Sequence, residues 1–156
     1  MNLEWIKYSA VGLFVLFLDK IIFSHLNLWG ISFDPLLIYI IWMLPKQDRI
    51  PSIYTVAFLA FVQDVFFDSW GLYLFSKSLI VLFFHRYLRD KFETKIFGGQ
   101  FFYHSLVIAL THNLIFYVFA SLTGDYATGW WPFLLLLISS LYTSLISFLT
   151  YLIYYK

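Results

Sequence analysis

The stretch RYLRDKFETK at positions 86–95 decides how this chain is arranged, because it places four of the ten Lys and Arg residues in one gap between two long apolar runs. With these four, eight of the ten basic residues fall in every second gap along the chain: Lys7, then Lys46 and Arg49, then Arg86, Arg89, Lys91 and Lys95, and finally Lys156. The intervening gaps, around positions 25–27, 68–69 and 123–129, contain none. This alternation is what the positive-inside rule predicts for a polytopic membrane protein with short loops.

The composition is that of a chain that lies mostly in lipid. Hydrophobic residues make up 62% of the 156 residues and charged residues 12%, about half the usual share in soluble domains. A soluble chain of this length could not hide so much apolar surface in one core. The net charge of +1 gives no electrostatic support for nucleic-acid binding, and the absence of Cys excludes disulfides and thiol chemistry.

Six apolar segments are long enough to be membrane-spanning helices, which need about 20 residues each. We therefore predict an all-α integral membrane protein, a six-helix transmembrane bundle that forms a single domain over residues 1–156. The second segment would be too short if it began at Asp34-Pro35, so residues 28–33 are included in it. With six spans, the charge alternation places both termini and both basic loops in the cytoplasm. The predicted spans are 6–24, 28–45, 51–68, 70–88, 101–123 and 130–155.

Ionisable side chains inside the apolar segments are expensive to bury, so they are the first candidates for function. They are Asp19, Lys20, Asp34, Asp64, Asp68 and Lys77. At about 1.5 Å per residue, they fall in the outer half of the bilayer at comparable depth. We expect Lys77 to neutralise Asp64, Asp68 or Asp19. Three interpretations stay open: an internal ion pair that orients the spans, a polar pocket for a partner or substrate, and a proton relay.

Two further segments carry polar residues with helical spacing. His104, Ser105 and His112 would need a third orienting group to act as a hydrolase, and the two His residues are too far apart for a metal-binding pair, so we expect hydrogen bonds between helices. The sixth segment has a stripe of small polar residues that lets helices approach closely, either within the bundle or against a second protein. The stripe consists of Ser140, Thr143, Ser144 and Ser147. No catalytic, cofactor-binding or metal-binding set is predicted, and the chain is expected not to be an enzyme.

The chain resembles the rod-shape-determining protein MreD family of bacteria over nearly its whole length. The resemblance is most specific at Asp34-Pro35 before an aliphatic span, at the end of the third span up to Asp64, and at Gly71-Leu72 in the turn to the fourth span. MreD-like sequences have a Pro/Asp pair, a Gly-Leu-x-x-Asp end and a Leu-Gly turn at these places. Here the pair and the turn are in reversed order, and Ala60-Phe61 stands where Gly-Leu is expected.

This resemblance implies a non-enzymatic scaffold in the bacterial inner membrane, without a cofactor, that takes part in cell elongation. It implies the bitopic protein MreC as partner, support of RodA and a class B penicillin-binding protein in peptidoglycan synthesis, and a fold similar to the S-components of energy-coupling-factor transporters. The alternative is a transporter S-component itself, which binds a vitamin or micronutrient. Such proteins dock through small residues spaced four apart in the first span, whereas Ala10 and Gly12 have no small residue four positions away.

Overall fold

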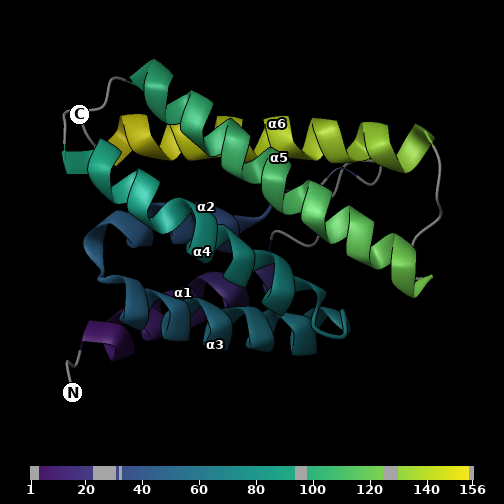
Figure 1. Cartoon of the computed structure of the whole chain (residues 1–156), viewed down its shortest axis with the longest axis horizontal. Coiled ribbons are helices and arrows are strands. Elements are labelled where there is room, and N and C mark those ends of the chain that lie inside the picture. Colours follow the sequence, from purple (N-terminus) through teal and green to yellow (C-terminus); the bar gives the residue numbers. More distant parts are fainter. Residues whose placement is uncertain (1–3, 23–30, 32, 94–97, 125–129, 155–156) are drawn as a thin grey trace.

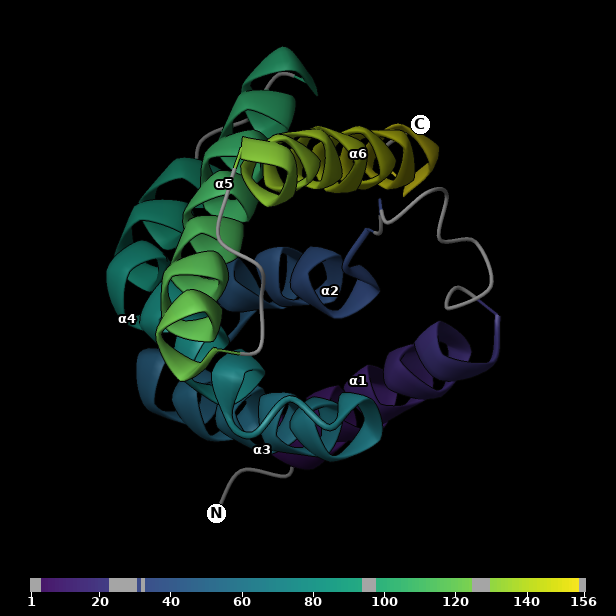
Figure 2. The same ribbon diagram turned by 90° about the vertical axis from the view of Figure 1, so that its right-hand side faces the viewer.

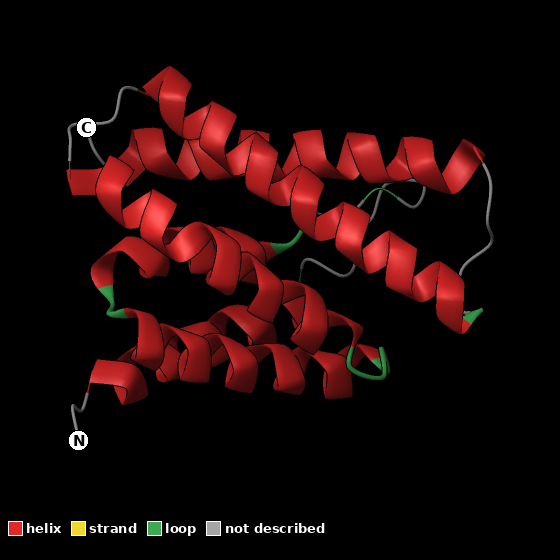
Figure 3. Ribbon diagram, viewed as in Figure 1, coloured by secondary structure: helices red, strands yellow, loops and turns green. Residues whose placement is uncertain are grey.

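A computed structural model describes residues 4–22, 31, 33–93, 98–124 and 130–154, and within these ranges the chain forms helices and no strand (Figures 1 and 3). The helices are α1 (Glu4–Ile21), α2 (Pro35–Met43), the short 3-10 helix η2 (Leu44–Lys46), α3 (Arg49–Phe67), α4 (Leu72–Glu93), α5 (Gly98–Thr123) and α6 (Trp130–Tyr154). The prediction of an all-α protein is therefore confirmed for the described residues.

The short helix α2 lies at the centre, and the five longer helices form an open arc around it (Figure 2). Along the arc, α1 packs on α3, α3 on α4, α4 on α5, and α5 on α6, while α2 contacts α1, α5 and α6. Leu36, Leu37, Ile40 and Ile41 of α2 are all buried in the main hydrophobic core. The centre of the bundle is thus filled by an apolar helix that has neighbours on nearly every side.

Helices α1 and α3 run side by side in the same direction, and a glycine sets their closest approach. A Cβ atom added to Gly12 would lie 2.3 Å from Cδ1 of Leu59, so any side chain at this position would force Leu59 or the helices to shift. Further along the pair, the rings of Phe17 and Phe66 meet edge to face at 5.6 Å. These two contacts fix which residues of α1 and α3 lie at the same level.

The predicted spans 51–68 and 70–88 leave almost no residues between them, and the structure has a tight turn there. Asp68 and Trp70 adopt positive φ angles of 55° and 48°, and Gly71 follows with φ of 90°. The Ser69 amide donates to the Asp64 carbonyl oxygen at 3.1 Å and so closes the end of α3. Helix α4 then begins at Leu72 and returns antiparallel to α3.

Three helices, α3, α5 and α6, are long and apolar enough to cross a membrane. The membrane character predicted from the sequence is therefore supported by the structure. Helices α1 and α4 are long but more charged, because α1 contains Lys7, Asp19 and Lys20 and the end of α4 carries the basic stretch from Arg86 onward.

The predicted second span is wrong in its extent. Residue 33 is not helical, and the helix begins at Pro35. Asp34 is its N-cap, because the Asp34 side chain accepts a hydrogen bond from the Leu37 amide in the first turn. Nine residues at 1.5 Å each give α2 a length of about 14 Å, roughly half of a bilayer's hydrocarbon core. Positions 28–30 and 32 lie outside the described residues.

A buried charge cluster as the candidate functional site

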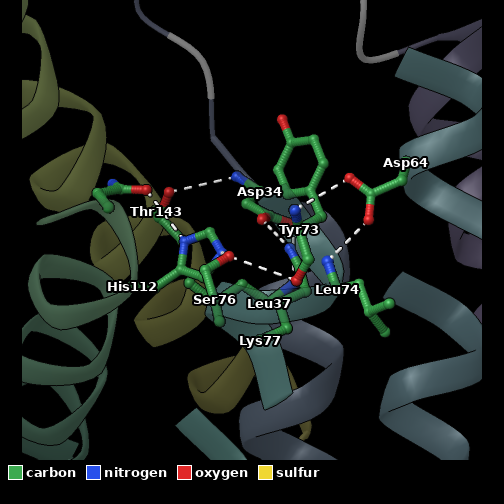
Figure 4. A network of polar contacts seen from close by, with 10 residues as sticks. Asp34, Leu37, Asp64, Tyr73, Leu74, Ser76, Lys77, His112 and Thr143 are labelled. Atoms are coloured by element: carbon green, nitrogen blue, oxygen red, sulfur yellow. Dashed lines mark hydrogen bonds and ion pairs between the residues drawn. The ribbon is translucent and has the colours of Figure 1, made fainter. Parts of the chain in front are cut away.

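A fully buried lysine forms the centre of the candidate site. The ammonium group of Lys77 on α4 forms an ion pair with the carboxylate of Asp34, whose side chain is 14% exposed (Figure 4). The sequence-based expectation that Lys77 pairs directly with Asp64, Asp68 or Asp19 is therefore wrong. The reason is the short central helix: because α2 starts only at Pro35, its first residue and the carboxylate before it lie inside the bundle beside α4.

Asp34 is held in place from three sides. Its carboxylate accepts the Leu37 amide at 2.9 Å, and its own amide donates to the Thr143 hydroxyl of α6 at 3.3 Å. The positive end of the α2 helix dipole adds a favourable interaction with the carboxylate. The ion pair thus joins the start of α2 to α4, and the hydrogen bond to Thr143 joins it to α6.

Asp64 has a different role from the one expected. Its two carboxylate oxygens accept the Tyr73 amide at 3.0 Å and the Leu74 amide at 2.8 Å, so it caps α4 from the end of α3. Lys20 mirrors this arrangement, since its ammonium group donates to the Phe66 carbonyl at the C-terminal end of α3 at 2.9 Å. Asp68 is exposed at the end of α3 and does not join the cluster.

Asp19 lies on the buried face of α1 and faces the ion pair. It is 8% exposed and within electrostatic range of both Asp34 and Lys77. In the described part of the chain, its carboxylate has no hydrogen bond or ion-pair partner. The structure therefore brings Asp19, Asp34, Asp64 and Lys77 to one region but pairs only Asp34 with Lys77.

A chain of hydrogen bonds continues from this region to α6. The Ser76 hydroxyl and His112 Nε2 are 3.1 Å apart, and the other ring nitrogen of His112 lies 3.1 Å from Asn113 Oδ1. Asn113 Nδ2 donates to the Ser140 hydroxyl at 2.8 Å. The expected role of His112 in joining helices is confirmed, and His104 likewise meets the Tyr87 hydroxyl of α4 at 2.9 Å.

The small-residue stripe of α6 faces the bundle. Ser140, Thr143, Ser144 and Ser147 are all buried, and Ser147 lies 3.2 Å from the Ser105 hydroxyl of α5. Of the two interpretations left open by the sequence, helix packing within the protein is the one that the structure supports. The stripe is not available to a second protein.

Sequence reasoning did not single out Gln63, which is 2% exposed on α3 and whose side-chain oxygen has no partner among the described residues. The signal was present, because Gln63 precedes Asp64 in an otherwise apolar segment. Within the described ranges, no three His, Asp or Glu side chains are grouped to hold a metal ion. The contacts of the cluster orient helices and balance buried charge.

The chain matches no family model, no curated protein and no solved structure. The resemblance to the MreD family therefore stays a prediction.

Proposed function

We propose that this chain is a non-enzymatic membrane scaffold of the bacterial cell-elongation complex, which binds an MreC-like bitopic partner laterally. The observation that carries this proposal is the open arc: α1 packs on α3 and α2 and forms one free end of the bundle (Figure 2). In this proposal the scaffold supports RodA and a class B penicillin-binding protein, and so contributes to peptidoglycan synthesis and cell shape.

The outward face of α1 is the proposed docking surface. The small-residue stripe of α6 is packed inside the bundle, and α2 is buried. Of the first two helices, only α1 therefore has a face that a partner can reach. Phe14 is 63% exposed, and Val11 and Ile21 are exposed on the same helix. Beside them, the small exposed residue Ala10 allows a partner helix to approach closely.

Ala10→Phe is expected to abolish co-purification of an MreC-like partner without changing the folding of the scaffold. A phenyl ring on the outward face of α1 prevents a partner helix from approaching closely. When no partner is bound, the ring only contacts lipid, so folding is unaffected. The measurement is the amount of partner retained on the tagged scaffold in detergent. Thr150→Phe on the exposed part of α6 is the matched control and should retain the partner. Equal retention with Ala10→Phe would mean that α1 is not the interface.

We further propose that all six helices take part in a six-span topology in the bacterial inner membrane, with both termini in the cytoplasm. Two buried charges, Asp19 of α1 and Lys77 of α4, support this, because they point into the bundle and not toward lipid. The large exposed apolar side chains of α3, α5 and α6 then contact membrane lipids.

Reporter fusions test this topology. A reporter joined after Lys156 and one inserted between α4 and α5, at positions 94–97, should both give a cytoplasmic signal, because the positive-inside rule places the basic residues on that side. A fusion in the turn at Ser69 should give a periplasmic signal. A periplasmic signal at Lys156 contradicts six spans.

A second candidate function is a substrate-binding S-component of a vitamin or micronutrient transporter. The buried Asp34–Lys77 pair favours it, because an ionic group inside a membrane bundle is a common feature of substrate sites. High-affinity binding of a vitamin-like molecule to the purified chain, together with no retention of an MreC-like partner, would select this function over the scaffold.

A further inference from the structure

Asp19 is the one carboxylate of the cluster whose charge has no direct partner in the described residues. It shares the buried face of α1 with Ser9, Gly12 and Leu16, which places it toward the interior. The charged groups that face this region are Lys20 on the same helix, Asp34 before α2, Asp64 on α3 and Lys77 on α4. Each of these has a contact that Asp19 lacks.

Each of these groups has a direct polar contact, although only Lys77 and Asp34 pair with an opposite charge. Lys77 is paired with Asp34, Asp64 is stabilised by two backbone amides at the positive end of α4, and Lys20 is bound to a carbonyl oxygen at the negative end of α3. An ionised Asp19 would have no direct contact of this kind in the described residues, and only Lys77 and Lys20 would compensate it, from a distance. Such a charge is costly in a bundle that lies in lipid, unless a proton or a cation compensates it.

A second oxygen atom without a partner lies on the neighbouring helix. Gln63 is on the buried face of α3, and its Oε1 accepts no hydrogen bond in the part of the chain that the structure describes. The contacts Gly12–Leu59 and Phe17–Phe66 lie on either side of Gln63 along the α1–α3 pair. Gln63 is thus level with the part of α1 between Gly12 and Phe17, about one helical turn before Asp19.

We propose that Asp19, assisted by Gln63, binds one exchangeable positive charge, supplied by a proton or by a Na⁺-sized monovalent cation. The carboxylate supplies the negative charge and the amide oxygen a neutral ligand. The Lys77–Asp34 pair is already neutral as a unit and fixes the neighbouring helices. This site is separate from the docking surface on α1, because Asp19 points inward and Ala10 outward.

The test uses the purified full chain in detergent, with Na⁺ replaced by choline at constant ionic strength. If the charge is Na⁺, adding Na⁺ raises the melting temperature of the parent in a saturable way, and Asp19→Asn removes this response. Gln63→Leu should weaken the apparent Na⁺ affinity by at least about tenfold, which corresponds to one lost ligand at about 1.4 kcal/mol per factor of ten. Asp68→Asn, an exposed carboxylate at the end of α3, is the matched control and should respond as the parent does.

The proton is distinguished by infrared spectroscopy. If the charge is a proton, Na⁺ has no specific effect, and the parent shows a protonated-carboxyl band that disappears as the pH is raised and is missing in Asp19→Asn. Should that variant fail to fold, a change in the position of this band in Gln63→Leu identifies the same site. The proposal is overturned if the parent shows neither a Na⁺ response nor such a band, or if Asp68→Asn changes the signal as strongly as Asp19→Asn.

Discussion

Lys77→Met is expected to lower the free energy of unfolding by about 3–5 kcal/mol, the usual cost of removing one partner of a buried ion pair. The substitution keeps most of the side-chain volume but leaves the carboxylate of Asp34 without its cation at the centre of the bundle. Asp34 also positions the first turn of α2 through the Leu37 amide, so the damage extends to the central helix. The measurements are the yield of monodisperse protein in detergent and its melting temperature.

The compensating change identifies the partner of Lys77. Asp34→Asn in the Lys77→Met background removes the unpaired charge and retains an oxygen that caps α2, so it should restore part of the lost yield. Lys7→Met, on an exposed part of α1, is the control and should melt within about 0.5 kcal/mol of the parent. Restoration by Asp64→Asn and not by Asp34→Asn would mean that Asp64 is the functional counter-charge of Lys77.

Ser140→Phe is expected to prevent normal folding, and for this reason it is uninformative about partner binding. The Ser140 side chain is buried between α5 and α6, where it donates to the Leu136 carbonyl and accepts from Asn113. A phenyl ring overpacks this contact at a cost of about 1–3 kcal/mol and removes the acceptor of Asn113, at about 1 kcal/mol more. The expected result is a large loss of the monodisperse fraction in size-exclusion chromatography.

Leu141→Phe provides the matched control for this change. Leu141 is the next residue of α6 and is exposed to the surroundings of the bundle, so an added ring there meets no neighbouring helix. It should leave the monodisperse fraction unchanged. If Ser140→Phe folds as well as Leu141→Phe, the close contact of α5 and α6 at Ser140 is contradicted.

The elements themselves could largely be read from the sequence. Apolar length and the turn at Asp68 to Gly71 are local properties, and the helices on either side of that turn begin and end close to where the pattern places them. The start of α2 was misjudged because the requirement for a full-length span was given more weight than the capping pattern of Asp34 and Pro35. The local pattern was the correct guide, since a buried short helix does not have to cross a bilayer alone.

The pairings within the site could be predicted only in part. The spacing of Asp64 and Lys77 gives their depth along two helices, but it does not tell which carboxylate is nearer to the ammonium group. Which carboxylate is nearer depends on where α2 lies among the five longer helices. No local sequence pattern determines that position. The orientation of the Ser140 stripe was open for a similar reason, because a spacing of three and four is the same for an internal face and for an interface.

The central position of α2 also sets an order of events during synthesis. A nine-residue helix headed by a carboxylate is too short to be retained in the bilayer as an independent span. Lys77, which neutralises that carboxylate, follows 43 residues later, and Thr143, which accepts the Asp34 amide, follows 109 residues later. The ribosome therefore delivers α2 long before the groups that hold its first turn. The contacts of Asp34 with Lys77 and Thr143 can therefore form only after α4 and α6 have been made, although α2 is among the first segments to be synthesised.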